Sequence, residues 1–249
     1  MGTNMERRSF LSLLMLAALP VGAAEAVTWP LLVSQRLDAN GKPAPISELT
    51  QTILTYISLK SDVKFELQPY PWKRALLLAQ EGVAPIWGIS RNLERDKIFI
   101  FSHSVYSTNV WMVVRKDRFF PIASIADLKG KHVSVPQGGA FNSEFESARA
   151  NKLFTVEDDP HSLDIRFAKL IAGRCDVMLV SNRIDTATKL EIYFKSYGFD
   201  ADQFQIIERP LLIDEIHIAI LKSKADTFPM EAINRAIDAG RKAGDFERM

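Results

Sequence analysis

The sequence is poor in cysteine and histidine. Its single cysteine, Cys175, rules out a disulfide within the chain and a metal site built from several cysteines. The four histidines, His103, His132, His161 and His217, have none of the spacings typical of metal ligands. We expect each of them to lie on the surface or in a structural hydrogen bond, and we expect no cofactor.

An excess of charge of one sign is also missing. Lys and Arg number 31 and Asp and Glu number 30, which gives a formal net charge of +1 and does not favour nucleic acid as a partner. Hydrophobic residues make up 47% of the chain, a share typical of a folded globular protein rather than a disordered one. No G-x-S-x-G, H-E-x-x-H or P-loop motif is present, so no common catalytic signature points to an enzyme.

Residues 1–26 have the pattern of a secretory signal peptide. Arg7 and Arg8 form a charged start, and an apolar run of ten residues follows at 10–19, too short for the roughly 20 residues that span a bilayer. Small residues end at Ala26, where cleavage would leave Val27 first. The paired arginines also fit the twin-arginine pattern, so general secretory and twin-arginine export both stay open. We expect a periplasmic protein; an uncleaved anchor is the alternative.

Short apolar segments alternate with amphipathic ones along residues 27–249. Strands are predicted at 27–33, 63–67, 84–89, 98–101, 110–114, 132–135, 154–156, 175–180, 204–207 and 216–221. Helices are predicted at 48–57, 71–80, 141–150, 162–172, 184–197 and 229–242, with one helical turn at 124–128. This alternation predicts an α/β fold with mainly parallel sheets, and a polar stretch at 115–118 divides it into two runs.

Several short segments also match a known pattern in order and spacing. They are Pro69–Leu76 (PYPWKRAL), Glu81-Gly82, Arg95, Phe101-Ser102, Tyr106, Ile125–Val133 (IADLKGKHV) and Leu170–Val177 (LIAGRCDV). Together they resemble the extracellular solute-binding protein family 3, the periplasmic substrate-binding proteins of polar amino-acid ABC transporters. The resemblance extends over nearly all of residues 27–249.

The resemblance implies a two-lobed fold of the periplasmic-binding-protein type II, with a ligand cleft and a hinge between the lobes. Lobe 1 would comprise 27–113 and the returning segment 212–249, and lobe 2 would comprise 114–211, with the hinge at the crossings. We expect a monomer that closes on a small molecule by hinge motion and delivers it to a membrane permease or a sensor partner, without catalysis.

The resemblance places ligand contacts of lobe 1 at Arg95, Ser90 and Gly88. Relatives present an arginine at the first position to the ligand's carboxylate, which a guanidinium can hold with two parallel hydrogen bonds. The other two residues end the preceding strand, where backbone N–H groups and hydroxyls help. The alternative is that Arg95 is a surface residue paired with Glu94 or Asp96.

In lobe 2, glycines precede a helix at Gly138 and Gly139, where free backbone N–H groups can approach an anion. Relatives usually place a hydroxyl residue next, and this chain has Ala140. Asn142 or Ser143 would replace that donor or cap the helix.

A further departure falls where amino-acid-binding relatives carry an aspartate for the ligand's ammonium. That position is Ser181, followed by Asn182, and neither is charged. A buried ammonium would lack its partner, which disfavours an ordinary α-amino acid as ligand.

Aromatic residues offer walls for the cleft. Trp72 and Tyr106 are the candidates, with Trp72 equally compatible with packing in the lobe core, and Trp29 and Phe141 are further candidates. We expect Trp87 and Trp111 to belong to the core.

Three functions stay open: a solute-binding protein for transport, a sensory or accessory binding protein, and an enzyme on the same scaffold. Some relatives are dehydratases of cyclic carboxylic acids. That chemistry would need a general acid or base, for which Glu144, Asp185 and His217 are the candidates.

Overall fold

The structure, a computed structural model, describes residues 27–35 and 42–248, with side chains to residue 246. The predicted signal peptide at 1–26 lies outside the described residues. The strands are β1 Thr28–Ser34, β2 Lys64–Tyr70, β3 Ile86–Ser90, β4 Phe99–Phe101, β5 Tyr106–Arg115, β6 His132–Pro136, β7 Thr155–Asp159, β8 Val177–Asn182, β9 Phe204–Ile206 and β10 Leu212–Leu221.

The α-helices follow the predicted segments closely. They are α1 Glu48–Ser61, α2 Trp72–Gln80, α3 Leu93–Asp96, α4 Ser143–Ala150, α5 Leu163–Ile171, α6 Ala187–Ser196, α7 Met230–Lys242 and α8 Asp245–Arg248. Short 3-10 turns lie at Lys116–Arg118, Ile125–Leu128 and Lys222–Thr227. The short helices α3 and α8 were not predicted, because four residues are too few to show a helical period.

Local sequence signals fix the first helices. Ser47 caps α1 through its side chain, which accepts a hydrogen bond from the backbone N–H of Thr50 at 3.3 Å. Pro71 stands just before α2, where its missing N–H costs no helical hydrogen bond. α2 therefore begins at Trp72, with its first turn at the end of β2.

The strands form one mixed sheet of ten strands in the order β2-β1-β3-β10-β5-β8-β6-β7, with β4 also on β10 and β9 also on β5. Parallel pairs lie at the two ends, where β1 joins β2 and β3, and β6 joins β7 and β8. The long strands β5 and β10 pair antiparallel with each other and with their neighbours. The predicted α/β class is confirmed, and the parallel pairs are joined through an antiparallel centre.

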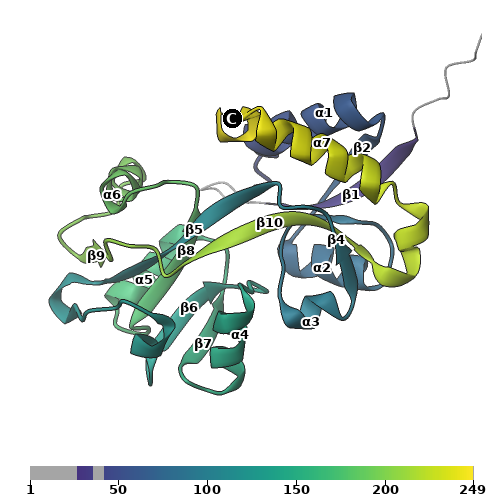
Figure 1. The fold of residues 1–249 in the computed structure, drawn as a ribbon. Helices are drawn as coiled ribbons and strands as arrows, with labels where there is room; N and C mark the ends of the chain where they lie inside the picture. Colours follow the sequence, from purple (N-terminus) through teal and green to yellow (C-terminus); the bar gives the residue numbers. More distant parts are fainter. Residues whose placement is uncertain (1–26, 36–41, 249) are drawn as a thin grey trace, which may run out of the picture.

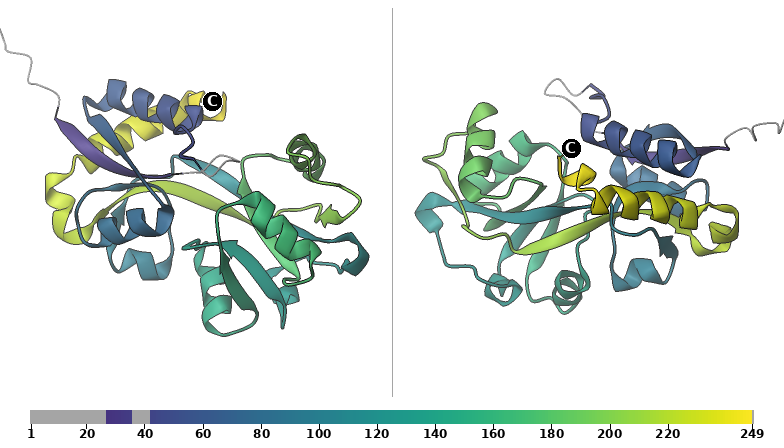
Figure 2. Two further views of the ribbon diagram at one scale, coloured as in Figure 1. Left: turned by 180° about the vertical axis from the view of Figure 1, so that it is seen from behind. Right: turned by 45° about the horizontal axis from the view of Figure 1, so that its top comes forward.

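The elements gather at opposite ends of β5 and β10 (Figure 1). We call the end that carries β1–β4, α1–α3, α7 and α8 lobe 1, and the end that carries β6–β9 and α4–α6 lobe 2. In lobe 1, α1 and α7 lie together on one side of the sheet and α2 on the other, as the views of Figure 2 also show. Each lobe thus has helices on both faces of its part of the sheet.

The buried side chains follow the same division. One cluster of lobe 1 packs Ile53 and Ile57 of α1 against Ile233 and Ile237 of α7, and another packs α2 on the opposite face. Two further clusters fill lobe 2, one beneath α4 and one beneath α5 and α6. Hydrophobic burial on both faces of the sheet accounts for two separate cores.

Trp87 and Trp111 are both buried, as predicted from their apolar strands. Cys175 is also buried, and burial raises the pKa of its thiol to about 11, so it behaves as a small apolar side chain.

Candidate functional site

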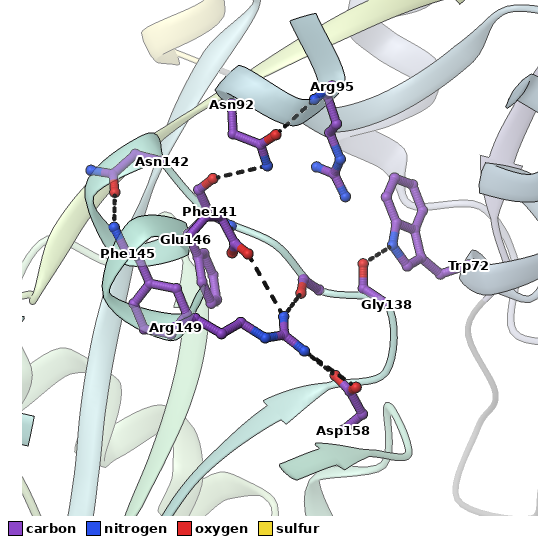
Figure 3. Close-up of polar contacts among 11 residues, drawn as sticks. Trp72, Asn92, Arg95, Gly138, Phe141, Asn142, Phe145, Glu146, Arg149 and Asp158 are labelled. Atoms are coloured by element: carbon purple, nitrogen blue, oxygen red, sulfur yellow. Dashed lines mark hydrogen bonds and ion pairs between the residues drawn. The ribbon is translucent and has the colours of Figure 1, made fainter. Parts of the chain in front are cut away.

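The two lobes touch at the Arg183 contact with Phe246 and, on another side, where the start of α2 meets the loop between β6 and α4. The indole Nε1 of Trp72 donates a hydrogen bond of 2.8 Å to the carbonyl oxygen of Gly138 (Figure 3). Gly138 has φ of +73°, and a Cβ there would lie 3.0 Å from Cδ1 of Trp72. Glycine therefore suits this position for two reasons: it tolerates the left-handed backbone, and it leaves room for the indole of Trp72.

Two more hydrogen bonds join the lobes beside the first. The Nδ2 of Asn92 donates to the carbonyl of Phe141 at 3.3 Å, and the backbone N–H of Leu93 donates to Oγ of Ser143 at 3.3 Å. The residue pairs 72/138, 92/141 and 93/143 thus form an interlobe seam. Helix starts on both sides hold it in place.

Asparagine side chains cap the helices on both sides of the seam. Oδ1 of Asn92 accepts from the backbone N–H of Arg95 at 2.9 Å, and Oδ1 of Asn142 accepts from that of Phe145 at 3.0 Å. Asn142 therefore caps α4, which is one of the two roles considered for it, while Ser143 contributes its hydroxyl to the seam.

Arg95 lies beneath the seam, with only 7% of its surface exposed. Its Nη1 donates to the carbonyl of Ser90 at 2.8 Å, the one hydrogen-bond acceptor that the described residues supply to the guanidinium. The surface alternative is wrong, because Glu94 pairs with Lys97 and Asp96 pairs with Arg91. In Figure 3 the guanidinium points into the space bordered by Trp72 and the loop between β6 and α4.

The electrostatic setting of Arg95 is unusual for an arginine. Burial lowers the pKa of its guanidinium to about 10, and the carboxylates of Glu146 and Asp214 partly offset that shift. The guanidinium remains charged at neutral pH, and most of its N–H donors are free to face a ligand.

Asp214 is a residue that sequence analysis missed. It lies on β10 with 4% of its surface exposed, and its Oδ2 accepts a hydrogen bond of 2.6 Å from Oγ of Ser90. Burial raises the pKa of the Asp214 carboxyl to about 6, although Ser90 and Arg95 both act to lower it. Alternation between buried Leu212 and Ile216 would have placed this aspartate on the inner face, had the strand been predicted from 212.

Lobe 2 contributes a second pair of charges. Oε1 of Glu146 accepts from the backbone N–H of Phe141 at 3.0 Å, and its Oε2 lies 3.8 Å from Nη1 of Arg149. Arg149 also reaches Asp158 at 3.3 Å and the carbonyl of Gly139 at 3.4 Å. Figure 3 shows the Glu146 carboxylate on the side of the space opposite Arg95.

The remaining predicted residues fall in different places. Gly88 has φ of +82° and open space where a side chain would begin, whereas a Cβ on Gly139 would meet the Pro136 carbonyl at 2.7 Å. Ser181 is exposed at the carboxyl end of β8. Tyr106 packs beside Trp87 on the cluster beneath α1 and α7, and so is not brought to Arg95.

The other aromatic candidates lie in the cores. Trp29 packs edge-on against Phe228 in lobe 1. Phe141 is buried in lobe 2 with its ring edge-on to Phe145, although its backbone N–H and carbonyl both face the site. Trp72 is thus the aromatic side chain that takes part in the interlobe seam.

The three residues considered for acid–base chemistry are not assembled into a site. Glu144 is exposed on α4, Asp185 is exposed and pairs with Lys189, and His217 is buried on β10. Nδ1 of His217 lies 2.9 Å from the Ser102 carbonyl, its Nε2 is buried without a partner, and burial lowers the pKa of its ring. None of the described contacts joins these three side chains.

A separate cavity of about 580 Å³ lies in lobe 2, between α5 and residues 198–204. It is lined by Asp164, Phe167, Ala168, Ile171, Ala172, Gly198, Phe199, Asp200, Gln203 and Phe204. Its two carboxylates are exposed, and it holds no buried charged group. Arg95 and its neighbours therefore remain the candidate site.

Within the described part of the chain, no group of three or more His, Cys, Asp or Glu residues is arranged to hold a metal ion. Between residues 27 and 248, no described helix combines the length and the apolar character that crossing a bilayer requires. A buried guanidinium with free donors, two nearby carboxylates and exposed backbone groups can bind and orient a small polar molecule.

No protein-family model and no curated protein matches the sequence, but solved structures match the fold. An ancestral arginine-binding protein bound to arginine is 22% identical, has a TM-score of 0.62, and the match covers 89% of this chain and 95% of that one. The GluR0 ligand-binding core from Nostoc punctiforme in complex with L-glutamate is 17% identical, with a TM-score of 0.63 and coverage of 88% and 96%.

A histidine kinase sensor domain with similarity to periplasmic binding proteins is 17% identical, has a TM-score of 0.66, and the match covers 90% of this chain and 94% of that chain. All three matches extend over most of both chains, so the likeness concerns the whole fold rather than one lobe. The chain therefore has the α/β fold of periplasmic binding proteins.

Proposed function

We propose that this protein is a periplasmic solute-binding protein that captures a small carboxylate-bearing molecule between its lobes for ABC-type import. The observation that carries the proposal is Arg95, a charged guanidinium buried between the lobes with one hydrogen-bond acceptor among the described residues. Leaving such a group without an anion is costly, whereas a carboxylate can take two of its N–H donors at once.

The neighbours of Arg95 suit it to a clamp. The Ser90 carbonyl fixes Nη1, and the capped turn at Asn92 fixes the backbone, so the guanidinium is oriented before ligand arrives. From the other side, the backbone at Gly138 and Gly139 can approach a ligand closely. Preorganised donors reduce the entropy lost on binding.

We further propose that the residue ranges 27–113 with 212–249, and 114–211, act as lobes that close about the crossing strands. The interlobe seam supports this division, since its three hydrogen bonds can form only when the lobes are together. The separate cores support it as well, because each lobe can move as a rigid body around β5 and β10.

Export and partners complete the proposal. Residues 1–26 would direct the chain across the inner membrane by the general secretory or twin-arginine route, after which it would act as a monomer and pass its ligand to a permease. Neighbours that bind arginine and glutamate support amino-acid-like ligands. The histidine kinase sensor domain favours a second candidate, in which the closed form signals to a membrane protein.

A thermal-shift screen of residues 27–249 against amino acids, dicarboxylates, aromatic acids and polyamines tests the proposal. A ligand at a hundred times its Kd adds roughly 2.7 kcal/mol of stability. We expect hits that carry a carboxylate, and we expect Arg95→Ala to abolish their effect and Arg95→Lys to weaken it.

The matched control is Arg91→Ala, because Arg91 is an exposed arginine that pairs with Asp96. It should leave every hit unchanged. A carboxylate ligand that binds Arg95→Ala as well as the unaltered protein contradicts the clamp. Conversion of a hit to a new compound, followed by mass spectrometry, contradicts the binding role.

A further inference from the structure

Arg95 lies near two carboxylates, Glu146 and Asp214, and is hydrogen-bonded to neither. A ligand carboxylate that binds Arg95 brings a third negative charge into the same poorly solvated space. Like charges at short range raise one another's pKa, and they oppose binding unless a positive charge enters as well.

Glu146 already has a cationic partner within lobe 2. Its Oε1 accepts the backbone N–H of Phe141, and its Oε2 faces Arg149 at 3.8 Å. Arg149 in turn contacts Asp158, so this carboxylate already belongs to a chain of alternating charges.

Asp214 is placed differently. Among the described residues, Ser90 donates the one hydrogen bond to its carboxylate, and only 4% of the Asp214 surface is exposed. Across the antiparallel pair of β10 and β5, Asp214 stands directly opposite Thr108, whose Oγ1 is buried without a hydrogen-bond partner. Directly opposite side chains share one face of the sheet, with Cβ atoms about 4.5–5.5 Å apart.

We infer that the site captures an organic anion together with a proton, the anion on Arg95 and the proton on Asp214. The inference rests on the proposed function. The proton comes from bulk water and converts the Asp214 carboxylate to a carboxylic acid, with no other bond made or broken. Ser90 links the two charged groups, because its carbonyl accepts from Nη1 of Arg95 and its hydroxyl donates to Oδ2 of Asp214, which leaves Oδ1 of Asp214 to bind the proton.

The charges that face Asp214 come from several elements. They are Arg95 on α3, Glu146 on α4 and the neighbouring Glu215 on β10, with the neutral Ser90 on β3 and Thr108 on β5. Burial already raises the pKa of Asp214 to about 6, and a ligand carboxylate on Arg95 would raise it further. Binding therefore takes up a proton above pH 6, and affinity rises as the pH falls.

The residues at the position that the resemblance assigns to the ligand's ammonium point to carboxylic acids that lack an ammonium group next to the carboxylate. At the end of β8, Ser181 is uncharged, and Oδ1 of Asn182 is occupied by the backbone N–H of Ile184. The proton then supplies the positive charge that an amino acid would carry itself.

Calorimetry with matched compounds tests the inference. The probes are glutarate with L-glutamate, and 5-guanidinopentanoate with L-arginine, each pair differing only in the α-ammonium group. Titrations at about pH 6 and about pH 8, in buffers of different ionisation heat, report the protons taken up. We expect the deaminated member of a pair to bind, with uptake of up to one proton and up to tenfold tighter binding per pH unit.

Asp214→Asn keeps the acceptor for Ser90 and should bind with no proton uptake and a flat pH profile. Glu215→Gln is the control, because it removes the adjacent exposed carboxylate and should leave the uptake intact. Should Asp214→Asn fail to fold, carbon NMR of the unaltered protein reports the Asp214 titration with and without glutarate. The pKa that this titration reports for Asp214 should be higher when glutarate is bound.

Binding without proton uptake, an unchanged Asp214 titration, or binding by the amino acids alone overturns the inference and leaves the carboxylate clamp standing. Failure of all four compounds to bind at either pH overturns the inference together with the proposed capture of carboxylates.

Discussion

Among the described residues, each lobe contains one buried arginine, and the two differ in how their donors are used. In lobe 2, Arg166 donates to Oγ of Ser134 at 3.1 Å, to its carbonyl at 2.9 Å and to the carbonyl of Leu179 at 2.6 Å. In lobe 1, Arg95 donates from its guanidinium to a single carbonyl. Burial lowers both pKa values to about 10, so burial and charge alone do not separate the two residues.

The difference lies in what remains unsatisfied. Arg166 joins strands β6 and β8 from within a core, and its Nε and Nη2 donors are taken by Ser134 and Leu179. Arg95 lies between the lobes, and its guanidinium has N–H donors for which no described residue supplies an acceptor. A buried guanidinium that makes several hydrogen bonds within the protein stabilises the fold, whereas one that makes a single bond is suited to a ligand.

The largest expected effect comes from replacing the two arginines with methionine. Arg166→Met should cost roughly 3 kcal/mol of unfolding free energy, because it strands buried carbonyls that have lost their donor. Arg95→Met should change stability far less and abolish carboxylate binding. Urea denaturation with the ligand screen distinguishes the two, and equal loss of stability would erase the contrast between them.

Asp214→Asn should stabilise the free protein by up to roughly 2 kcal/mol at neutral pH. The pKa of Asp214 is about 6 in the folded state and lower in the unfolded state. The ionised carboxylate therefore destabilises the folded protein above pH 6, and this loss of stability disappears below the unfolded pKa. Stability of the unaltered protein should therefore rise as the pH falls toward 4, relative to the variant. Urea midpoints across this range measure the difference; parallel curves for the two proteins would contradict it.

Trp72→Phe tests the seam, because it keeps the aromatic ring and removes the hydrogen bond to Gly138. The loss should be about 1 kcal/mol, expressed as roughly fivefold weaker ligand binding with little change in unfolding. X-ray scattering of the ligand-free protein should show a larger radius of gyration. Trp29→Phe, remote from the seam in the lobe 1 core, serves as the control for ring substitution.

The smallest effect belongs to Glu157 on β7, which pairs with Lys169 and His132. The Lys169 hydrogen bond is the main cause that lowers the pKa of this carboxyl. Its contribution to lobe 2 is complete above the unfolded pKa and is lost as the pH falls through the folded one. Glu157→Gln should thus reduce the loss of unfolding free energy on acidification by a few tenths of a kcal/mol. This is the opposite of the effect expected for Asp214→Asn, which removes a gain of stability on acidification.

Much of the fold followed from the sequence, because its signals are local. Apolar alternation and caps such as Ser47 and Pro71 gave the elements, and Trp87 and Trp111 were placed in the core correctly. The continuity of the sheet through β5 and β10 could not be predicted, since it depends on pairing between residues about a hundred positions apart.

Residues of the candidate site could be predicted only where the local sequence carries a recognisable pattern. Gly138 precedes a helix, and Arg95 matched a pattern of relatives, so both were selected. Asp214, Thr108 and Glu146 carry no such mark, because their setting depends on partners in other elements: Ser90, β10 and Phe141. Nor can composition tell Arg95 from Arg166, since only tertiary contacts separate them.

The return of the chain through β10 has a consequence for the order in which the protein is completed. All of lobe 2 is encoded in one uninterrupted stretch, whereas the α1 face of lobe 1 stays uncovered until α7, near the end of the chain, packs on it. During synthesis, lobe 2 can therefore fold first. A nascent chain that stops before residue 230 would have a complete lobe 2 and a lobe 1 whose apolar α1 face is exposed. That exposed face would depend on a chaperone to avoid aggregation.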